Sequence, residues 1–179
     1  MSKKLNLTIE PQKCSEWCWA AVTTAIGRVF EDDQCPAEQC ALVNEVVVEA
    51  GKDCCTECNC QKDPFDPCNK PKNLAVALNH CHFDRDGPAG ISSLSFEDVK
   101  GEIDDGHPIA VSIKVVNDAA AISHAVVIFG YSDDGKVNVA DPMQAGSQLS
   151  VSLAELVAGK SSQLDGTWEA AFRTKRRDE

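Results

Sequence analysis

The residues best suited to carry out a chemical reaction lie in the segment QKCSEWCWAA, at positions 12–21. A cysteine is a strong nucleophile only as a thiolate, and the start of a helix supplies partial positive charge and free N–H groups that favour the thiolate. The mixture of apolar and small residues from Ser15 to Phe30 predicts a helix that begins near Ser15 or Glu16. Cys18 would then lie in the first helical turn, which makes it a candidate nucleophile.

Gln12 precedes Cys18 by six positions, close enough for its side-chain amide to point at a carbonyl carbon under attack by the thiolate and to bind its oxygen. Together with the backbone N–H of Cys18, this amide would form an oxyanion hole with two donors. Loss of one such donor typically lowers the rate by about 10²–10³. Gln12 is therefore a candidate for transition-state stabilisation.

A cysteine nucleophile also needs a base, and His124 opens the apolar run HAVVIFGY. Asp141-Pro142 follows the next expected strand, 17 positions after His124. Taken singly, a cysteine at a helix start is more often structural, the histidine suits a buried strand edge, and Asp-Pro suits a turn. Their occurrence together, in this order, matches what the family resemblance described next implies, a catalytic set of Cys18, His124 and Asp141.

The sequence pattern of a glutamine, five further residues and then Cys-Trp-Ala resembles the active-site segment of papain-like cysteine proteases. The wider pattern resembles a bacterial branch that includes plant-directed effector proteases and is related to the double-glycine leader peptidases of bacteriocin exporters. This resemblance spans roughly Gln12 to Asp141. The third catalytic residue is Asp rather than the Asn of papain, and no Ser-Trp follows it, but the bacterial branch shares both departures.

The resemblance implies a thiol-dependent endopeptidase that hydrolyses peptide bonds of a peptide or protein substrate through a thioester on Cys18. His124 would act as base and then acid, and Asp141 would orient its ring. The enzyme would be a secreted bacterial effector or a processing protease. We also assign Trp17, Trp19 and Ser123 to the substrate cleft, with a place in the core as the alternative for the two tryptophans.

Helical patterns precede strand patterns along the chain, which predicts an α+β fold. The resemblance makes this a papain-like fold, with a helical half at about 12–105 packed on an antiparallel sheet half at about 106–175, in a single domain of residues 1–179. The expected helices, after the one at Ser15–Phe30, are Pro36–Gly51, Lys72–His80, Ser95 to about Asp104, and Val151–Ala158. The expected strands are Pro108–Val116, His124–Tyr131, Val137–Ala140 and Thr167–Arg173.

Half of the ten cysteines lie in a loop at 52–71, which has neither helical nor strand periodicity. Two to four disulfides would suit an exported protein. The alternative is structural zinc, for which the ligands would be Cys55, Cys58, Cys60 and Cys68. We favour disulfides and no cofactor, and we expect Cys14 to be a free thiol.

The composition excludes several classes of partner. The formal net charge of −11 disfavours nucleic acid and anionic membrane surfaces. No apolar stretch reaches the ~18 residues that span a membrane, and the first residues do not form a secretory signal. We expect a cytoplasmic protein or one exported by a specialised route, and we treat the basic residues at 173–177 as a solvated tail. The sequence makes no prediction about oligomeric state.

Three other functions are compatible with parts of the sequence. An acyltransferase could use the same catalytic set, although the transglutaminases place Cys and His much closer than the 106 positions seen here. A catalytically silent peptide-binding protein would normally have lost one of the three residues. An interaction module stabilised by zinc or disulfides would leave Gln12, His124 and Asp141 without a role.

Overall fold

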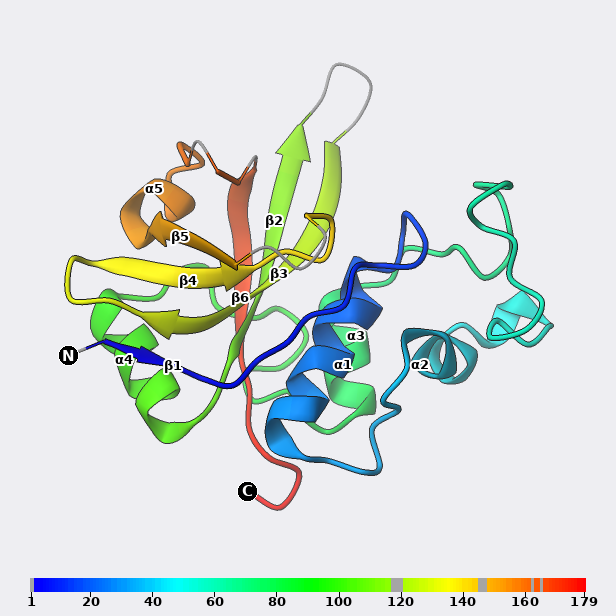
Figure 1. The fold of residues 1–179 in the computed structure, drawn as a ribbon, viewed down its shortest axis with the longest axis horizontal. Helices are drawn as coiled ribbons and strands as arrows, with labels where there is room; N and C mark the ends of the chain where they lie inside the picture. Colours follow the sequence, from blue (N-terminus) through cyan, green and yellow to red (C-terminus); the bar gives the residue numbers. More distant parts are fainter. Residues whose placement is uncertain (1, 117–120, 145–147, 162, 165) are drawn as a thin grey trace.

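The computed structural model describes all residues except 1, 117–120, 145–147, 162 and 165. Helices fill the N-terminal half and an antiparallel sheet fills the C-terminal half, so the predicted α+β class is confirmed. Figure 1 shows the sheet on one side of the molecule, the helices α1, α2 and α3 on the other, and the Cys-rich loop beyond them.

The helices are α1 (Cys18–Phe30), α2 (Gln39–Val46), the short 3₁₀ helix η1 (Val48–Ala50), α3 (Leu74–His80), α4 (Phe96–Asp105) and α5 (Leu153–Val157). Ser95 caps α4 through a capping box with Asp98, as its sequence predicts. The second helix is shorter than expected at both ends. It stops at Val46, the first residue of the valine run at 46–48, because β-branched side chains lose rotamer freedom in a helix, and Gly51 closes η1 in the left-handed conformation.

The strands are β1 (Lys3–Lys4), β2 (Ile109–Val116), β3 (Ala121–Tyr131), β4 (Lys136–Ala140), β5 (Gln148–Ser152) and β6 (Thr167–Arg173). They form one sheet in the order β5-β4-β3-β2-β6, in which every neighbouring pair is antiparallel. The short strand β1 pairs with the last residues of β3, beyond the part of β3 that pairs with β2. The two backbones can come this close because residue 130 is a glycine: a Cβ at this position would lie only 2.7 Å from the Lys3 carbonyl oxygen. Neither β1 nor β5 was expected from the sequence.

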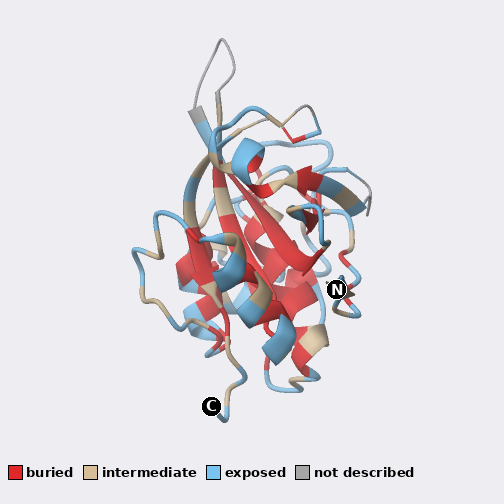
Figure 2. Cartoon of the chain, turned by 90° about the vertical axis from the view of Figure 1, so that its left-hand side faces the viewer, coloured by how far each residue is buried: buried red, intermediate tan, exposed pale blue. Residues whose placement is uncertain are grey.

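The sheet has a hydrophobic core on each face, and the buried residues follow its central strands (Figure 2). On one face, Val127 and Phe129 of β3 pack with Ala20 and Ile26 of α1. On the other face, alternate residues of β2 and β3 pack with α4 and α5. The helix α4, which falls within the range of the predicted helical half, therefore covers the back of the sheet.

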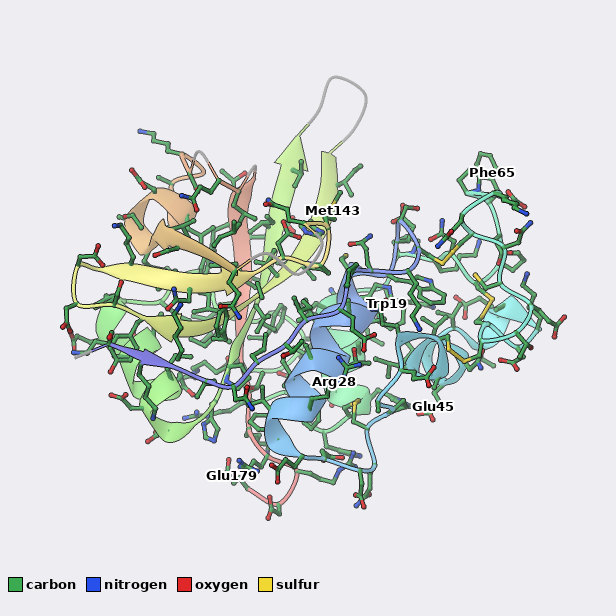
Figure 3. All side chains as sticks on the ribbon, viewed as in Figure 1. Trp19, Arg28, Glu45, Phe65, Met143 and Glu179 are labelled. Carbon is green, nitrogen blue, oxygen red and sulfur yellow. A yellow bond between two sulfur atoms is a disulfide. The ribbon has the colours of Figure 1, made fainter. Side chains whose placement is uncertain are left out.

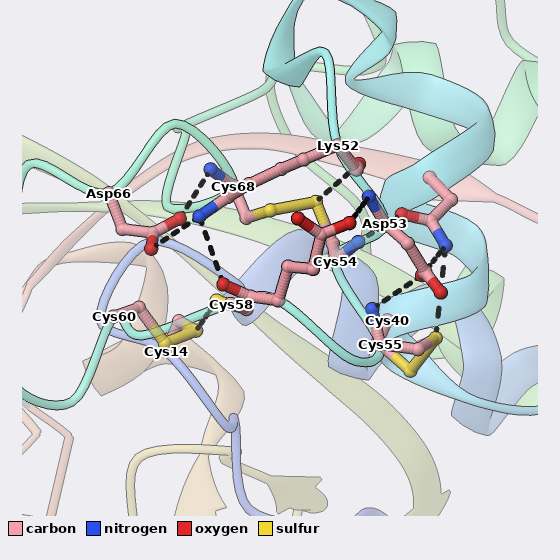
Figure 4. Close-up of a disulfide and its surroundings, with 12 residues drawn as sticks. Cys14, Cys40, Lys52, Asp53, Cys54, Cys55, Cys58, Cys60, Asp66 and Cys68 are labelled. Carbon is pink, nitrogen blue, oxygen red and sulfur yellow. Dashed lines mark hydrogen bonds and ion pairs between the residues drawn. A yellow bond between two sulfur atoms is a disulfide. The ribbon is translucent and has the colours of Figure 1, made fainter.

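Four disulfides tie the loop at 52–71 and the ends of the helices together: Cys14–Cys60, Cys35–Cys81, Cys40–Cys55 and Cys54–Cys68. Cys18 and Cys58 are free. The expectation that Cys14 is a free thiol is therefore wrong, because its sulfur is bonded to Cys60 of the folded-back loop. Figure 4 shows Cys58 beside this bond, with its sulfur 3.6 Å from that of Cys14.

A buried carboxylate adds a polar anchor to the same loop. Asp66 accepts hydrogen bonds from the Lys52 ammonium and from the backbone N–H groups of Asn59 and Cys68, each at 2.8 Å. Burial alone would raise the pKa of Asp66, but these donors lower it to about 2. The loop is therefore held by ionic contacts as well as by disulfides.

The C-terminal tail is attached to the helical half, contrary to our expectation of a solvated end. The Arg176 guanidinium donates to the Phe30 carbonyl at the end of α1 and stacks over the Phe30 ring, and Arg177 pairs with Asp32 at 3.0 Å. The tail thus connects the last strand of the sheet to the far end of α1. None of the helices in the described ranges is long and apolar enough to cross a bilayer.

Candidate active site

Cys18 is the first residue of α1, which begins two or three residues later than the sequence suggested. At this position its backbone N–H has no acceptor within the helix. The first turn contains no acidic residue, so nothing there neutralises the partial positive charge of the helix end. The helix end can therefore stabilise negative charge on the sulfur, which remains partly exposed.

His124 and Asp141 come from neighbouring strands. Val127 of β3 lies opposite Ala140 of β4, which places the earlier part of β3 beside the residue that follows β4. Nε2 of His124 lies 2.7 Å from Oδ1 of Asp141, and both side chains are buried. The same carboxylate oxygen accepts the backbone N–H of Met143 at 2.8 Å. The turn after β4 thus holds the carboxylate against the ring.

The structure also brings Cys18 near this pair, since Cys18 and His124 line the same cleft and Cys18 influences the pKa of the ring. Since Nε2 faces Asp141, Nδ1 is the ring atom left for the sulfur. Burial acts to lower the pKa of His124, but the interactions with Asp141 and Cys18 outweigh it and raise the pKa to about 9. At neutral pH the ring is therefore protonated, and it lies between a carboxylate and the sulfur.

Cys18 and His124 line one cleft of about 750 Å³ between α1 and the sheet. Trp19 and Ser123 also line it, and Trp19 donates its indole N–H to the Lys70 carbonyl. Trp17 does not line it: the side chain lies in the core and donates to the Cys68 carbonyl. In Figure 3, Trp19 lies at the start of α1 and Met143 beyond the end of β4.

Gln12 lies near the site but does not present a donor to the cleft. Its amide nitrogen donates to the carbonyl oxygens of Cys14 at 2.9 Å and Ser15 at 2.6 Å, and its buried Oε1 has no partner among the described residues. Its backbone N–H donates to the Pro142 carbonyl at 3.0 Å, which connects the segment before α1 to the turn after Asp141. The expected oxyanion position would require the amide to leave these two carbonyls.

The alternative zinc set is divided among other bonds. Cys55, Cys60 and Cys68 are each in a disulfide with a cysteine outside that set, and only Cys58 is free. Three-residue groups of close ligand atoms do exist around Cys58, but each includes sulfurs already bonded in disulfides. A disulfide sulfur has no thiolate to offer a metal.

Apart from Ser123, the residues on the wall of the cleft opposite α1 were not predicted from the sequence. Ser112 of β2 and Glu169 of β6 line it together with Ser123. Glu169 was recognisable only as a charged residue within an expected strand, and nothing in the sequence indicated that the strand would bring it to the cleft.

The chain was compared with curated proteins and with models of protein families. No curated protein matches it. The model of the Peptidase_C39 like family matches residues 4–172, which include the whole of the site described above. The chain therefore belongs to the peptidase C39-like family, whose members are cysteine peptidases of the papain-like superfamily.

Proposed function

We propose that this protein is a thiol-dependent endopeptidase in which Cys18 is the nucleophile, His124 the general acid and base, and Asp141 the residue that orients the histidine. The observation that carries the proposal is that Cys18 and His124 line one open cleft while Asp141 is hydrogen-bonded to the same histidine ring at 2.7 Å. Membership of a peptidase family supports the reaction class, and implies a peptide or protein substrate.

In the first half-reaction, the Cys18 thiolate attacks the carbonyl carbon of the scissile bond. A tetrahedral oxyanion forms and then collapses to a thioester, as protonated His124 donates its proton to the leaving amine. In the second half-reaction, neutral His124 removes a proton from water, and the resulting hydroxide attacks the thioester. The carboxylic acid product leaves, and the thiolate–imidazolium pair is restored.

Asp141 accepts the hydrogen bond from Nε2 throughout this cycle. The contact keeps Nδ1 directed at the sulfur and stabilises the imidazolium, which is the role of the third residue in such catalytic sets. The oxyanion would be bound by the backbone N–H of Cys18 and by the Gln12 side-chain amide. For this, the amide would break its hydrogen bonds to the Cys14 and Ser15 carbonyls and donate to the substrate oxygen instead.

We further propose that the protein works after export, as an effector or a processing protease. Four disulfides among ten cysteines support this, because such bonds persist in oxidising compartments and are rare in a reducing cytosol. Cys18 remains outside the disulfide network.

The nucleophile can be tested by labelling with an epoxide that reacts with activated thiolates, followed by peptide mapping by mass spectrometry. We expect one adduct on Cys18, none on Cys58, and loss of both the adduct and peptide hydrolysis in Cys18→Ala. Labelling of Cys58 in place of Cys18, or hydrolysis that persists in Cys18→Ala, would overturn the proposal. Addition of a primary amine should leave the carboxylic acid as the main product, whereas a dominant amide product would indicate acyl transfer.

A further inference from the structure

Glu169 lies in the substrate cleft because strand β6 contains a bulge at this residue. Ser112 of β2 lies opposite Ala170, whereas the next residue, Ile113, lies opposite Trp168, so Glu169 is the extra residue. Trp168 and Ala171 pack on the back of the sheet, while Ala170 and Phe172 pack on the helix side. The bulge thus allows two consecutive residues, Glu169 and Ala170, to line the cleft.

Two serine hydroxyls hold the carboxylate in place. Ser112 and Ser123 both donate to Oε2 of Glu169, at 2.9 Å and 2.7 Å, and their own oxygens lie 2.7 Å apart. Among the described residues, these hydrogen bonds go to Oε2 and none goes to Oε1, which is therefore the oxygen we assign to a ligand. Ser123 directly precedes His124 in β3. Its hydrogen bond therefore holds the Glu169 carboxylate near His124, the proposed general acid and base.

The carboxylate has no charge partner in the described part of the chain, where no Lys, Arg or His forms a salt bridge with it. The cleft contains one lysine, Lys72, which is paired with Glu49 outside it. Glu16 adds a second carboxylate to the lining. Apart from the Cys18–His124 pair, the cleft is therefore negatively charged.

We propose that Glu169, held by Ser112 and Ser123, is a specificity-determining residue that binds a lysine or arginine side chain of the substrate. This inference rests on the proposed peptidase function. Ala170 and Phe172, which line the same wall, provide an apolar surface for the long aliphatic part of such a side chain. The ammonium or guanidinium group would bind Oε1, and the overall charge of −11 would attract cationic peptides to the molecule.

The test compares the wild-type chain with Glu169→Gln and Glu169→Lys on a synthetic library of unmodified peptides, with cleavage positions mapped by mass spectrometry. The wild type should cut with Lys or Arg enriched at one constant position relative to the scissile bond. Kinetics then use one cleaved peptide and its Lys→Gln and Lys→Glu analogues. Glu169→Gln should lower kcat/KM on the lysine peptide about tenfold, since the acceptor of the lysine ammonium loses its negative charge, and leave the glutamine peptide within about twofold.

Glu169→Lys should reverse the preference and favour the glutamate peptide, a gain that misfolding could not produce. Glu155→Gln is the matched control: this exposed glutamate of α5 lies outside the cleft, and its variant should keep the wild-type preference. Cleavage without enrichment of Lys or Arg would overturn the inference and leave the peptidase proposal standing. So would a preference that survives Glu169→Gln, or an equal loss on the lysine and glutamine peptides. If the wild type cleaved no peptide at all, both proposals would fall.

Discussion

His124 and Asp141 form a buried pair in which Nε2 and Oδ1 lie 2.7 Å apart. The carboxylate and the sulfur of Cys18 together raise the pKa of His124 from 6.5 to about 9, against the effect of burial. A raised pKa means that the protonated, paired form is present at all lower pH values and is lost as the pH rises through about 9. The pair therefore determines the upper pH limit of the proposed thiolate–imidazolium state.

We predict that kcat/KM for peptide hydrolysis declines as the pH rises through about 9, and that Asp141→Asn moves this decline to lower pH. Without the carboxylate, neither its charge nor its hydrogen bond favours the imidazolium over the neutral ring. The measurement is a pH profile of kcat/KM for both proteins. A decline at the same pH in both would show that Asp141 does not control the ionisation of the histidine.

Gln12 gives a second prediction, because its amide has two possible roles. If it rotates to bind the oxyanion, Gln12→Ala should lower kcat by about 10²–10³ with a much smaller change in KM. The melting temperature should change little, because the two carbonyls that it binds in the free protein can turn to water. A lowered melting temperature with an unchanged kcat would instead identify Gln12 as a brace for the turn before Cys18.

The elements that carry the site were largely predictable. Thr167–Arg173 was predicted with both of its bounds, and Pro108–Val116 to within one residue, because runs of apolar and β-branched residues bounded by turn signals distinguish strands. The strand β5 was missed, and part of it was assigned to a helix. It is an edge strand with a single buried residue, Val151, so its conformation depends on pairing with β4 rather than on its own pattern.

The positions of individual side chains in and around the site could not be predicted, because they depend on contacts between residues that are far apart in the sequence. The pairing of Cys14 with Cys60 requires the loop at 52–71 to fold back on the segment before α1, which no local pattern encodes. The orientation of Gln12 depends on where a turn places two backbone carbonyls. Glu169 lies in the cleft because β6 has a one-residue bulge where it pairs with β2. Beyond the bulge, the alternation of side chains between the two faces of the sheet is shifted by one residue.

Thiol counting provides a third prediction. Denatured, unreduced protein should react with a thiol reagent at two cysteines, and reduced protein at all ten. Cys18→Ala and Cys58→Ala should each leave one reactive thiol, and the double variant none. A count well above two, together with zinc detected by elemental analysis in the native protein, would favour the metal-bound alternative over the disulfides.

The disulfide Cys35–Cys81 separates stability from catalysis, because it lies at the end of α1 opposite to Cys18. Cys35 packs against Gly27, near the last turn of α1, and Cys81 follows α3. The bond closes a loop across 46 residues, so its removal should lower the free energy of unfolding by about 4 kcal/mol through the entropy of the unfolded chain. The double variant Cys35→Ala/Cys81→Ala should therefore unfold at a lower denaturant concentration.

Below that concentration, the same variant should hydrolyse peptides with a kcat close to that of the wild type, because neither sulfur contacts the cleft. The control is Cys18→Ala, in which the effects should be reversed: no hydrolysis, with an unfolding midpoint near that of the wild type. Urea unfolding curves and kcat for both variants test the prediction. A double variant that remains folded but loses activity would show that the far end of α1 controls the position of Cys18, and the proposed separation of roles would be wrong.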